Sequence, residues 1–207
     1  MAVYDITLII DNQLAMWPGD QAYELGWTMQ QSGGDSVNVG NVRFSLHCGT
    51  HADAPLHVTA EGDPISAIHP EVYVGPAHLI DVRGKPVIQV ADLRGLDFSN
   101  TPRLLLRTGG WTDHTIFPTT IPVVALDVPE FLAEQGVCLL GLDVPSVDPI
   151  DSKELPIHHA LGRLNIHILE SLDLREPPLG RYELVALPLR IAGGDASPVR
   201  AILRDLV

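Results

Sequence analysis

The sequence predicts a mixed α/β fold that is rich in strands and forms one domain over residues 1–207. Of its 207 residues, 45% are hydrophobic, and no linker, repeat or low-complexity tract interrupts them, so the chain is large enough to bury a substantial core. Short apolar runs punctuated by Gly and Pro recur along the chain, as is typical of strands. Helical patterns are few. Together these observations favour an α/β domain dominated by its sheet.

The expected strands differ in how they are covered. Alternating VNVGNVRFSL (37–46) predicts a strand with one solvent-exposed face. The N-terminal stretch MAVYDITLII is expected to supply the first strand. Continuous apolar runs suit strands buried on both faces; these are ITLII (6–10), AHLIDV (77–82), RLLLRT (103–108), PVVALDV (122–128) and GVCLLGLDV (136–144).

Two segments carry helix signals. VPEFLAEQG (128–136) has Pro near its start and Gly after its last periodic residue, which is the usual asymmetry of helix ends. IHHALGRL (157–164) is expected to be helical and to end near Gly162. The helices should therefore flank the sheet.

Composition excludes several classes of partner. The 13 basic and 26 acidic residues give a formal charge of -13, which opposes nucleic acid and anionic membrane surfaces. No apolar run reaches the ~18 residues of a membrane span, and the N-terminal run contains Asp5 without a basic flank, unlike a signal peptide. The two cysteines, Cys48 and Cys138, do not make a disulfide framework. A cytoplasmic location is expected.

The stretch SLHCGTHADAPLH (45–57) contains the densest cluster of metal-binding residue types. Pro55 excludes a helix interior, so the segment is expected to be mainly extended, apart from a possible turn at Gly49. Side chains of equal parity then share one face. Imidazole and carboxylate suit Zn, Mn or Fe, and such a cluster is costly to bury without a cation. The residues of equal parity are His47, His51, Asp53 and His57.

Further ligands should come from elsewhere in the chain. His158 and His159 open the second helical segment, and Glu170 follows His158 by twelve positions at the end of an apolar stretch. A carboxylate there would need a partner if buried. Either histidine could be the ligand, although the spacing to Glu170 favours His158. His69 and His78 are expected to be structural or solvent-facing.

The motif H-x-G-T-H-x-D-A-P-x-H, from His47 to His57, resembles the signature of the cyclase family of metal-dependent hydrolases, whose bacterial members include kynurenine formamidases. The resemblance covers nearly the whole chain. Its fold would be an α/β domain of the swivelling β/β/α type, with a mixed, barrel-like sheet. Supporting segments are WPGD (17–20), GLDVPSVDP (141–149), HHALGRLNIHILE (158–170) and YELVALPLRIAGGDASPVRAIL (182–203).

The resemblance also implies a site and an activity. Two divalent ions, Zn or Mn, would be bound, and no organic cofactor is indicated, since the sequence has no dinucleotide or P-loop fingerprint. The implied reaction is hydrolysis of N-formyl-L-kynurenine to L-kynurenine and formate in tryptophan degradation, by a homodimer or higher homo-oligomer. The implied roles are His47, His51 and Asp53 on one ion, Asp53, His158 and Glu170 on the second, His57 as proton donor and acceptor, and Trp17 against the aromatic substrate.

The chemistry is consistent with these residues. A bound cation lowers the pKa of its water from ~15.7 toward ~7, and a histidine titrating near neutrality can carry the proton to the leaving nitrogen. Two rival functions remain open: a sister hydrolase that opens a cyclic, isatin-like amide, and a metal-binding module without turnover. Trp17 could instead cap the core. The segment GGDASPVR (193–200) could form a loop that lines the site or an oligomer contact, but a turn is the favoured interpretation and no catalytic role is assigned to it.

Overall fold

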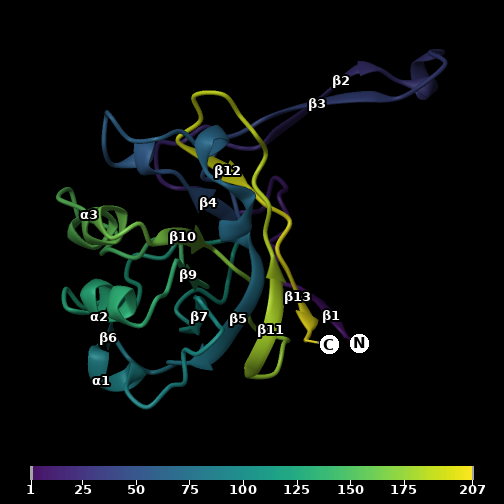
Figure 1. Ribbon diagram of the computed structural model, residues 1–207. Helices are drawn as coiled ribbons and strands as arrows, with labels where there is room; N and C mark the ends of the chain where they lie inside the picture. The colour runs from purple at the N-terminus through teal and green to yellow at the C-terminus, as the bar shows by residue number, and fades with distance from the viewer. Residues whose placement is uncertain (1, 207) are drawn as a thin grey trace.

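The computed structural model describes residues 2–206 and has a nine-stranded mixed sheet as its centre (Figure 1). The predicted α/β fold with a barrel-like sheet is confirmed. The strands are β1 (Val3–Asp5), β2 (Glu24–Met29), β3 (Val39–Arg43), β4 (His51–Asp53), β5 (Val74–Asp81), β6 (Val87–Ile88), β7 (Arg103–Arg107), β8 (Val123–Val124), β9 (Leu139–Leu142), β10 (His167–Glu170), β11 (Gly180–Val185), β12 (Ala196–Pro198) and β13 (Ile202–Asp205).

Few helices accompany the sheet. The α-helices are α1 (Val90–Leu93), α2 (Val128–Glu134) and α3 (Pro156–Arg163), and the short 3₁₀ turns are η1 (Gln31–Gly33), η2 (Pro55–His57), η3 (Ile65–Ala67) and η4 (Pro70–Tyr73). Both predicted helices are confirmed: α2 lies within 128–136, and α3 begins one residue before the predicted segment 157–164 and ends at Arg163. Among the described residues, no helix is long and apolar enough to cross a membrane.

The order of the main sheet is β1-β13-β11-β5-β7-β9-β10-β4-β12. Its four middle strands, β5, β7, β9 and β10, run parallel. Antiparallel strands extend both ends, with β11, β13 and β1 on one side and β4 and β12 on the other. This order places β4 beside β10, although more than a hundred residues separate them in sequence.

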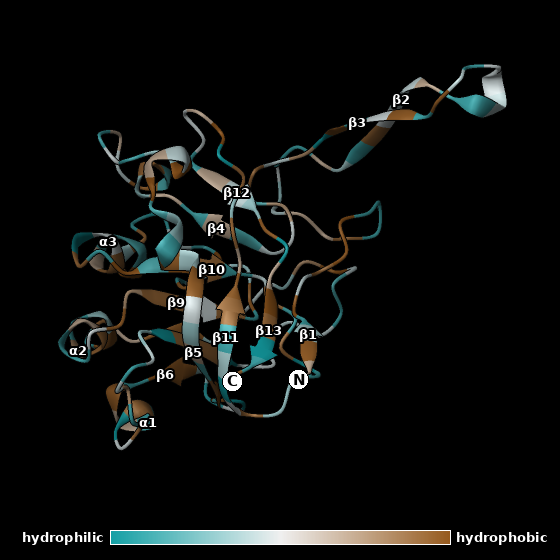
Figure 2. Ribbon diagram, turned by 45° about the vertical axis from the view of Figure 1, so that its right-hand side comes forward, coloured by the Kyte–Doolittle hydropathy of each residue, from teal (hydrophilic) through white to brown (hydrophobic). Residues whose placement is uncertain are grey.

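Alternate residues of the middle strands enter two different cores. Leu104 and Leu140 pack with the helices on one face, whereas Leu105 and Leu139 belong to the cluster on the opposite face. Strands covered on both faces are apolar throughout, as the continuous runs predict. Figure 1 shows α1, α2 and α3 on one side of the sheet, and in Figure 2 the middle strands are largely hydrophobic.

Two strand predictions were wrong in extent. The first strand ends at Asp5, and ITLII (6–10) continues it only through an isolated bridge between Thr7 and Leu172. The run PVVALDV yields only the two-residue β8, which pairs with β6 outside the main sheet. Apolar composition alone does not decide whether a run forms a strand, because an apolar run can also be buried as irregular chain that packs on the sheet.

The alternating run 37–46 was predicted to have one buried face, and this prediction was also wrong. All five residues of β3 are exposed. The strand pairs only with β2, in a hairpin that projects away from the body of the molecule (Figures 1 and 2). The alternation therefore gives the hairpin an apolar side that the rest of the chain does not cover.

Candidate metal centre and cavity

The site begins with two neighbouring strands. In the antiparallel ladder of β4 and β10, His51 lies opposite Glu170. Asp53 lies two residues after His51, so both side chains leave the same face of β4. On its other edge β4 pairs with β12, where Asp53 lies opposite Ala196. The central ligand candidates are thus held by backbone pairing on both sides.

The rest of the histidine-rich segment is not extended as predicted. Only His51–Asp53 forms a strand, and Pro55–His57 forms a 3₁₀ turn. Gly49 has φ +60°, in the left-handed region that glycine adopts easily, and a Cβ there would lie 3.2 Å from Ile10. This turn brings His47 back toward β4, so the histidines converge through turns and not through strand parity alone.

Asp53 is the centre of the cluster. Its Oδ1 lies 3.2 Å from His47 Nδ1 and 3.3 Å from His51 Nε2, while its Oδ2 lies 3.7 Å from His158 Nε2. Glu170 closes the opposite side, with Oε2 at 3.5 Å from His51 Nε2 and Oε1 at 3.4 Å from His158 Nε2. One carboxylate therefore faces three imidazoles, and a second carboxylate spans two of them.

These donor atoms fit a divalent cation. His51 Nε2 and both carboxylate oxygens of Asp53 are buried and have no hydrogen-bond partner, despite their short separations. Such atoms are costly to bury unless a cation satisfies them. Ligands at ~2.0–2.2 Å from a tetrahedral Zn²⁺ are about 3.3–3.6 Å apart, close to the separations of 3.2–3.7 Å within the cluster. Three groups of residues among those described could each hold an ion: His47, His51 and Asp53; Asp53, His57 and His158; and His47, His57 and Asp195.

The pKa values of His51 and Asp53 in the cluster are shifted by burial and by the groups around them. Burial alone would lower the pKa of His51, but Asp53 and Glu170 raise it to about 10. Burial would raise the pKa of Asp53, yet His47 and His51 hold it well below its usual range. The carboxylates thus favour positive charge at the centre of the site, which protons supply when no cation is bound.

The N-terminus of α3 positions His158. The Asp148 carboxylate accepts hydrogen bonds from the backbone N–H groups of Ile157 (3.1 Å) and His158 (3.0 Å), and it lies 2.7 Å from His158 Nδ1. A carboxylate is favourable at this end of a helix. It also turns His158 Nε2 toward Asp53 and Glu170. His159, the other candidate left open by the sequence, is not in the cluster.

His57 and Asp195 lie beside the cluster of histidines around Asp53. Asp195 Oδ2 is 3.0 Å from His47 Nε2 and 3.6 Å from His57 Nδ1. The His57 ring is 4.2 Å from the ring of His47. Burial and the neighbouring His47 and His158 lower the pKa of His57, although the carboxylates oppose the shift. His57 is therefore neutral near pH 7 and can accept a proton.

A cavity of about 440 Å³ opens above these residues. Trp17 lies in its wall, with its ring 5.2 Å from Phe117 in an edge-to-face arrangement, and Trp111 lies 6.0 Å beyond Phe117. Three aromatic rings thus stand over the histidine and carboxylate floor. Trp17 lies at the start of a turn and lines the cavity.

Several residues that line the cavity or support the histidines carry no pattern in the sequence that points to a function. Phe117 and Trp111 come from an irregular loop without a motif. Asp148 lies within GLDVPSVDP, where only the family resemblance drew attention to the segment. Asp195 lies in the segment GGDASPVR (193–200), for which a turn was predicted; its carboxylate contacts His47 and His57, and Ala196–Pro198 of this segment form β12.

Other reactive residues lie outside the site. Cys48 is fully buried among apolar side chains, and burial raises the pKa of its thiol to about 11. His69 is 70% exposed beside Glu71. His78 is on β5, away from the donor atoms. These placements agree with structural or solvent-facing roles.

Comparisons with known proteins were consistent with this geometry. The Cyclase family matches residues 4–149. Kynurenine formamidase of Bacillus cereus is 45% identical over 204 residues, which are 98% of this chain and 97% of that protein. Kynurenine formamidase of Geobacillus thermodenitrificans is 44% identical over the same shares of each chain.

Solved structures share the fold. A structure described as a potential metal-dependent hydrolase with cyclase activity has a TM-score of 0.83 and 28% identity, covering 98% of this chain and 96% of its own. Isatin hydrolase A from Ralstonia solanacearum has a TM-score of 0.80 at 23% identity, covering 98% and 91%, and it shows the fold alone. The chain belongs to the cyclase family.

Proposed function

We propose that the protein is a metal-dependent amide hydrolase that converts N-formyl-L-kynurenine to L-kynurenine and formate. The observation that carries the proposal is the position of the unsatisfied Asp53 carboxylate and its histidines beneath a cavity walled by aromatic rings. Relatives named kynurenine formamidase, identical at 45% over nearly the full chain, support this substrate over other amides.

The proposed ligands follow from the contacts of Asp53. His47, His51 and Asp53 would hold one ion, and Asp53, His158 and Glu170 would hold a second. Zn is the first choice and Mn the second, since both accept imidazole and carboxylate ligands. When bound, divalent cations polarise a carbonyl oxygen and supply hydroxide near neutral pH.

His57 is the proposed proton carrier. Its side chain is 29% exposed and lines the cavity, so it can reach a bound molecule. Its lowered pKa keeps the ring neutral, and a neutral imidazole can accept a proton as water attacks and return it to the departing amine. Formate and the free aryl amine would then leave through the cavity.

The aromatic rings in the cavity wall favour an aryl formamide as the substrate. Trp17 and Phe117 meet edge to face, which leaves the face of one ring available to stack against another aromatic group. Trp111 is held by its indole N–H, which donates to the carbonyl oxygens of Asp113 and Ile116. Such a wall would orient an aniline-type ring with its formyl group toward the ligand residues.

A cyclic amide is the second candidate substrate, and the shared fold with isatin hydrolases is the observation in its favour. The same floor could serve both reactions. A metal-binding module without turnover is the third possibility, but such a module would have no need for a neutral histidine beside an open aromatic cavity.

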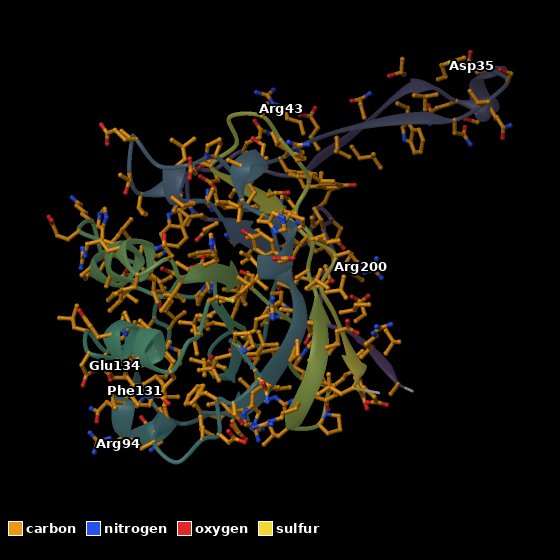
Figure 3. The ribbon with its side chains drawn as sticks, viewed as in Figure 1. Asp35, Arg43, Arg94, Phe131, Glu134 and Arg200 are labelled. Atoms are coloured by element: carbon orange, nitrogen blue, oxygen red, sulfur yellow. The ribbon has the colours of Figure 1, made fainter. Side chains whose placement is uncertain are left out.

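We further propose one catalytic domain over residues 1–207, a cytoplasmic location and a homodimer. Both cysteines are free thiols, which suits a reducing compartment. The hairpin of β2 and β3 supports the dimer, because a two-stranded hairpin alone is only marginally stable. Trp27 and Val42 are half-exposed on it, and Figure 3 shows Asp35 at its tip, far from the body.

Metal removal tests the activity. Protein stripped with a chelator should lose hydrolysis of N-formyl-L-kynurenine and regain it with Zn²⁺ or Mn²⁺ added separately, because the ligand set suits both ions. Mg²⁺, which prefers oxygen ligands, should restore little. Turnover is followed by release of formate, with isatin assayed in parallel. Full activity after verified stripping would contradict the proposal, and turnover of isatin alone would favour the cyclic amide.

Replacing His57 separates an enzyme from a binding module. H57A should keep its metal content, since Asp53 has other imidazole neighbours, while kcat falls by about 10²–10⁴-fold through loss of proton transfer. Metal is measured by elemental analysis and turnover by steady-state kinetics. H69A, at an exposed position, is the matched control and should match the wild type. Loss of metal together with activity would show that His57 is a ligand.

Trp17 tests the aromatic wall. W17A should raise KM for N-formyl-L-kynurenine by about ten- to a hundredfold, the equivalent of ~1.5–3 kcal/mol of lost apolar contact. W17F should recover part of the loss. A small aliphatic formamide serves as the control, because it has no ring to stack and its KM should not change. Equal effects on both substrates would argue that Trp17 only supports the core.

The hairpin provides the test of the dimer. Sedimentation velocity should give a dimer for the wild type, and W27E should shift it toward monomer, because the new charge would be buried without a partner. L126E is the control, since Leu126 is an exposed apolar residue between β8 and α2. A monomeric wild type, or an unchanged dimer in W27E, would refute the role assigned to the hairpin.

A further inference from the structure

Among residues 2–206, Asp195 is the carboxylate that lies within 4 Å of both His47 and His57. Its Oδ2 lies 3.0 Å from His47 Nε2 and 3.6 Å from His57 Nδ1, so the two rings stand on either side of a single oxygen. Asp195 also lines the cavity above the ligand candidates. It does not contact Asp53 or Glu170, so it lies beside the inner group, which consists of His47, His51, Asp53, His158 and Glu170.

The backbone fixes Asp195 in this place. The Asp195 carbonyl accepts a hydrogen bond from Ala54 N–H at 2.9 Å, and the preceding Gly194 carbonyl accepts one from Ile65 N–H at 2.8 Å. The next residue, Ala196, pairs with Asp53 in the β4–β12 ladder. Asp195 is therefore tied to the same strand that carries His51 and Asp53, and its side chain starts from a fixed position.

His51 and His158, the other two histidines of the inner group, indicate what the contact between Asp195 and His47 does. His51 Nδ1 lies 2.8 Å from the Gly49 carbonyl, and His158 Nδ1 lies 2.7 Å from Asp148. In each ring, one nitrogen meets an outer acceptor while the other faces the carboxylates. A histidine that ligates a metal usually donates its remaining N–H in this way, which fixes the tautomer and the ring orientation.

His47 follows the same arrangement with its nitrogens reversed. Its Nδ1 faces Asp53 at 3.2 Å, and its Nε2 meets Asp195 at 3.0 Å. A proton on Nε2, donated to Asp195, leaves the lone pair of Nδ1 directed at the centre of the site. Among the described residues, no other hydrogen bond to the His47 ring is present.

We propose that Asp195 is a positioning residue, which fixes the tautomer and orientation of His47 for metal binding and holds the adjacent ring of His57 at the edge of the site. The inference deepens the proposed function, since it assumes a metal at the inner group. It assigns a role to a residue that is remote in sequence from the histidine motif and that reaches it only through β12.

Metal affinity is the primary readout, because it needs no substrate. D195A should bind Zn²⁺ about 10–100-fold more weakly than the wild type in competition with a chromogenic chelator, the usual cost of losing such an outer partner. D195N keeps an acceptor oxygen without the charge, so its affinity should lie between the two. D63N removes a charge from an exposed aspartate nearby and should bind like the wild type.

Kinetics at saturating metal test the second part. D195A should retain a lower kcat with an unchanged KM, since the residual defect would lie in the proton transfer by His57 and not in binding of the aryl group. Unfolding of the metal-free D195A protein should match the metal-free wild type. If metal-free D195A were instead less stable to unfolding than the metal-free wild type, Asp195 would be a structural residue.

The outcomes separate this inference from the proposed function. Wild-type affinity in D195A, with hydrolysis intact, would overturn the inference and leave the function standing. Weak metal binding by D195A, together with no turnover of N-formyl-L-kynurenine by the wild type, would support the inference and overturn the substrate. A wild type that binds no metal would refute both.

Discussion

The site depends on a carboxylate that is buried without hydrogen bonds. Asp53 lies on β4 with both oxygens out of contact with water and facing imidazole nitrogens. Leaving such a charge uncompensated in an apolar interior costs several kcal/mol. The surrounding histidines, the second carboxylate of Glu170 and the outer acceptors can all be understood as the arrangement that makes this burial tolerable when a cation is bound.

The pairing of strands in the sheet brings several of these side chains around Asp53. Because β4 pairs with β10 on one edge and β12 on the other, His51, Glu170 and Asp195 are all positioned from strand ladders or their immediate ends. His47 and His57 lie in turns beside β4, and His158 is held at the start of α3 by hydrogen bonds to the Asp148 carboxylate. Sites built on regular elements keep their side chains in place better than sites built on loops.

The cavity, in contrast, is built from loops. Trp17, Trp111 and Phe117 come from irregular segments that meet only over the ligand floor. The histidine and carboxylate cluster is thus centred on paired strands, whereas the aromatic wall of the cavity comes from loops. The fold is shared with an isatin hydrolase, and a fold alone does not specify the reaction that it carries out.

The sequence alone determined the residue types of the site and much of the sheet. The dense histidines and Asp53 indicated a metal, and the apolar runs at β5, β7 and β9 predicted strands buried on both faces, because these are local patterns. Only the tertiary structure decided that His158 and not His159 faces Glu170, that Asp148 and Asp195 support the histidines, and that the 37–46 strand projects from the body. Those outcomes depend on strand order and helix capping between residues far apart in sequence, which local spacing does not specify.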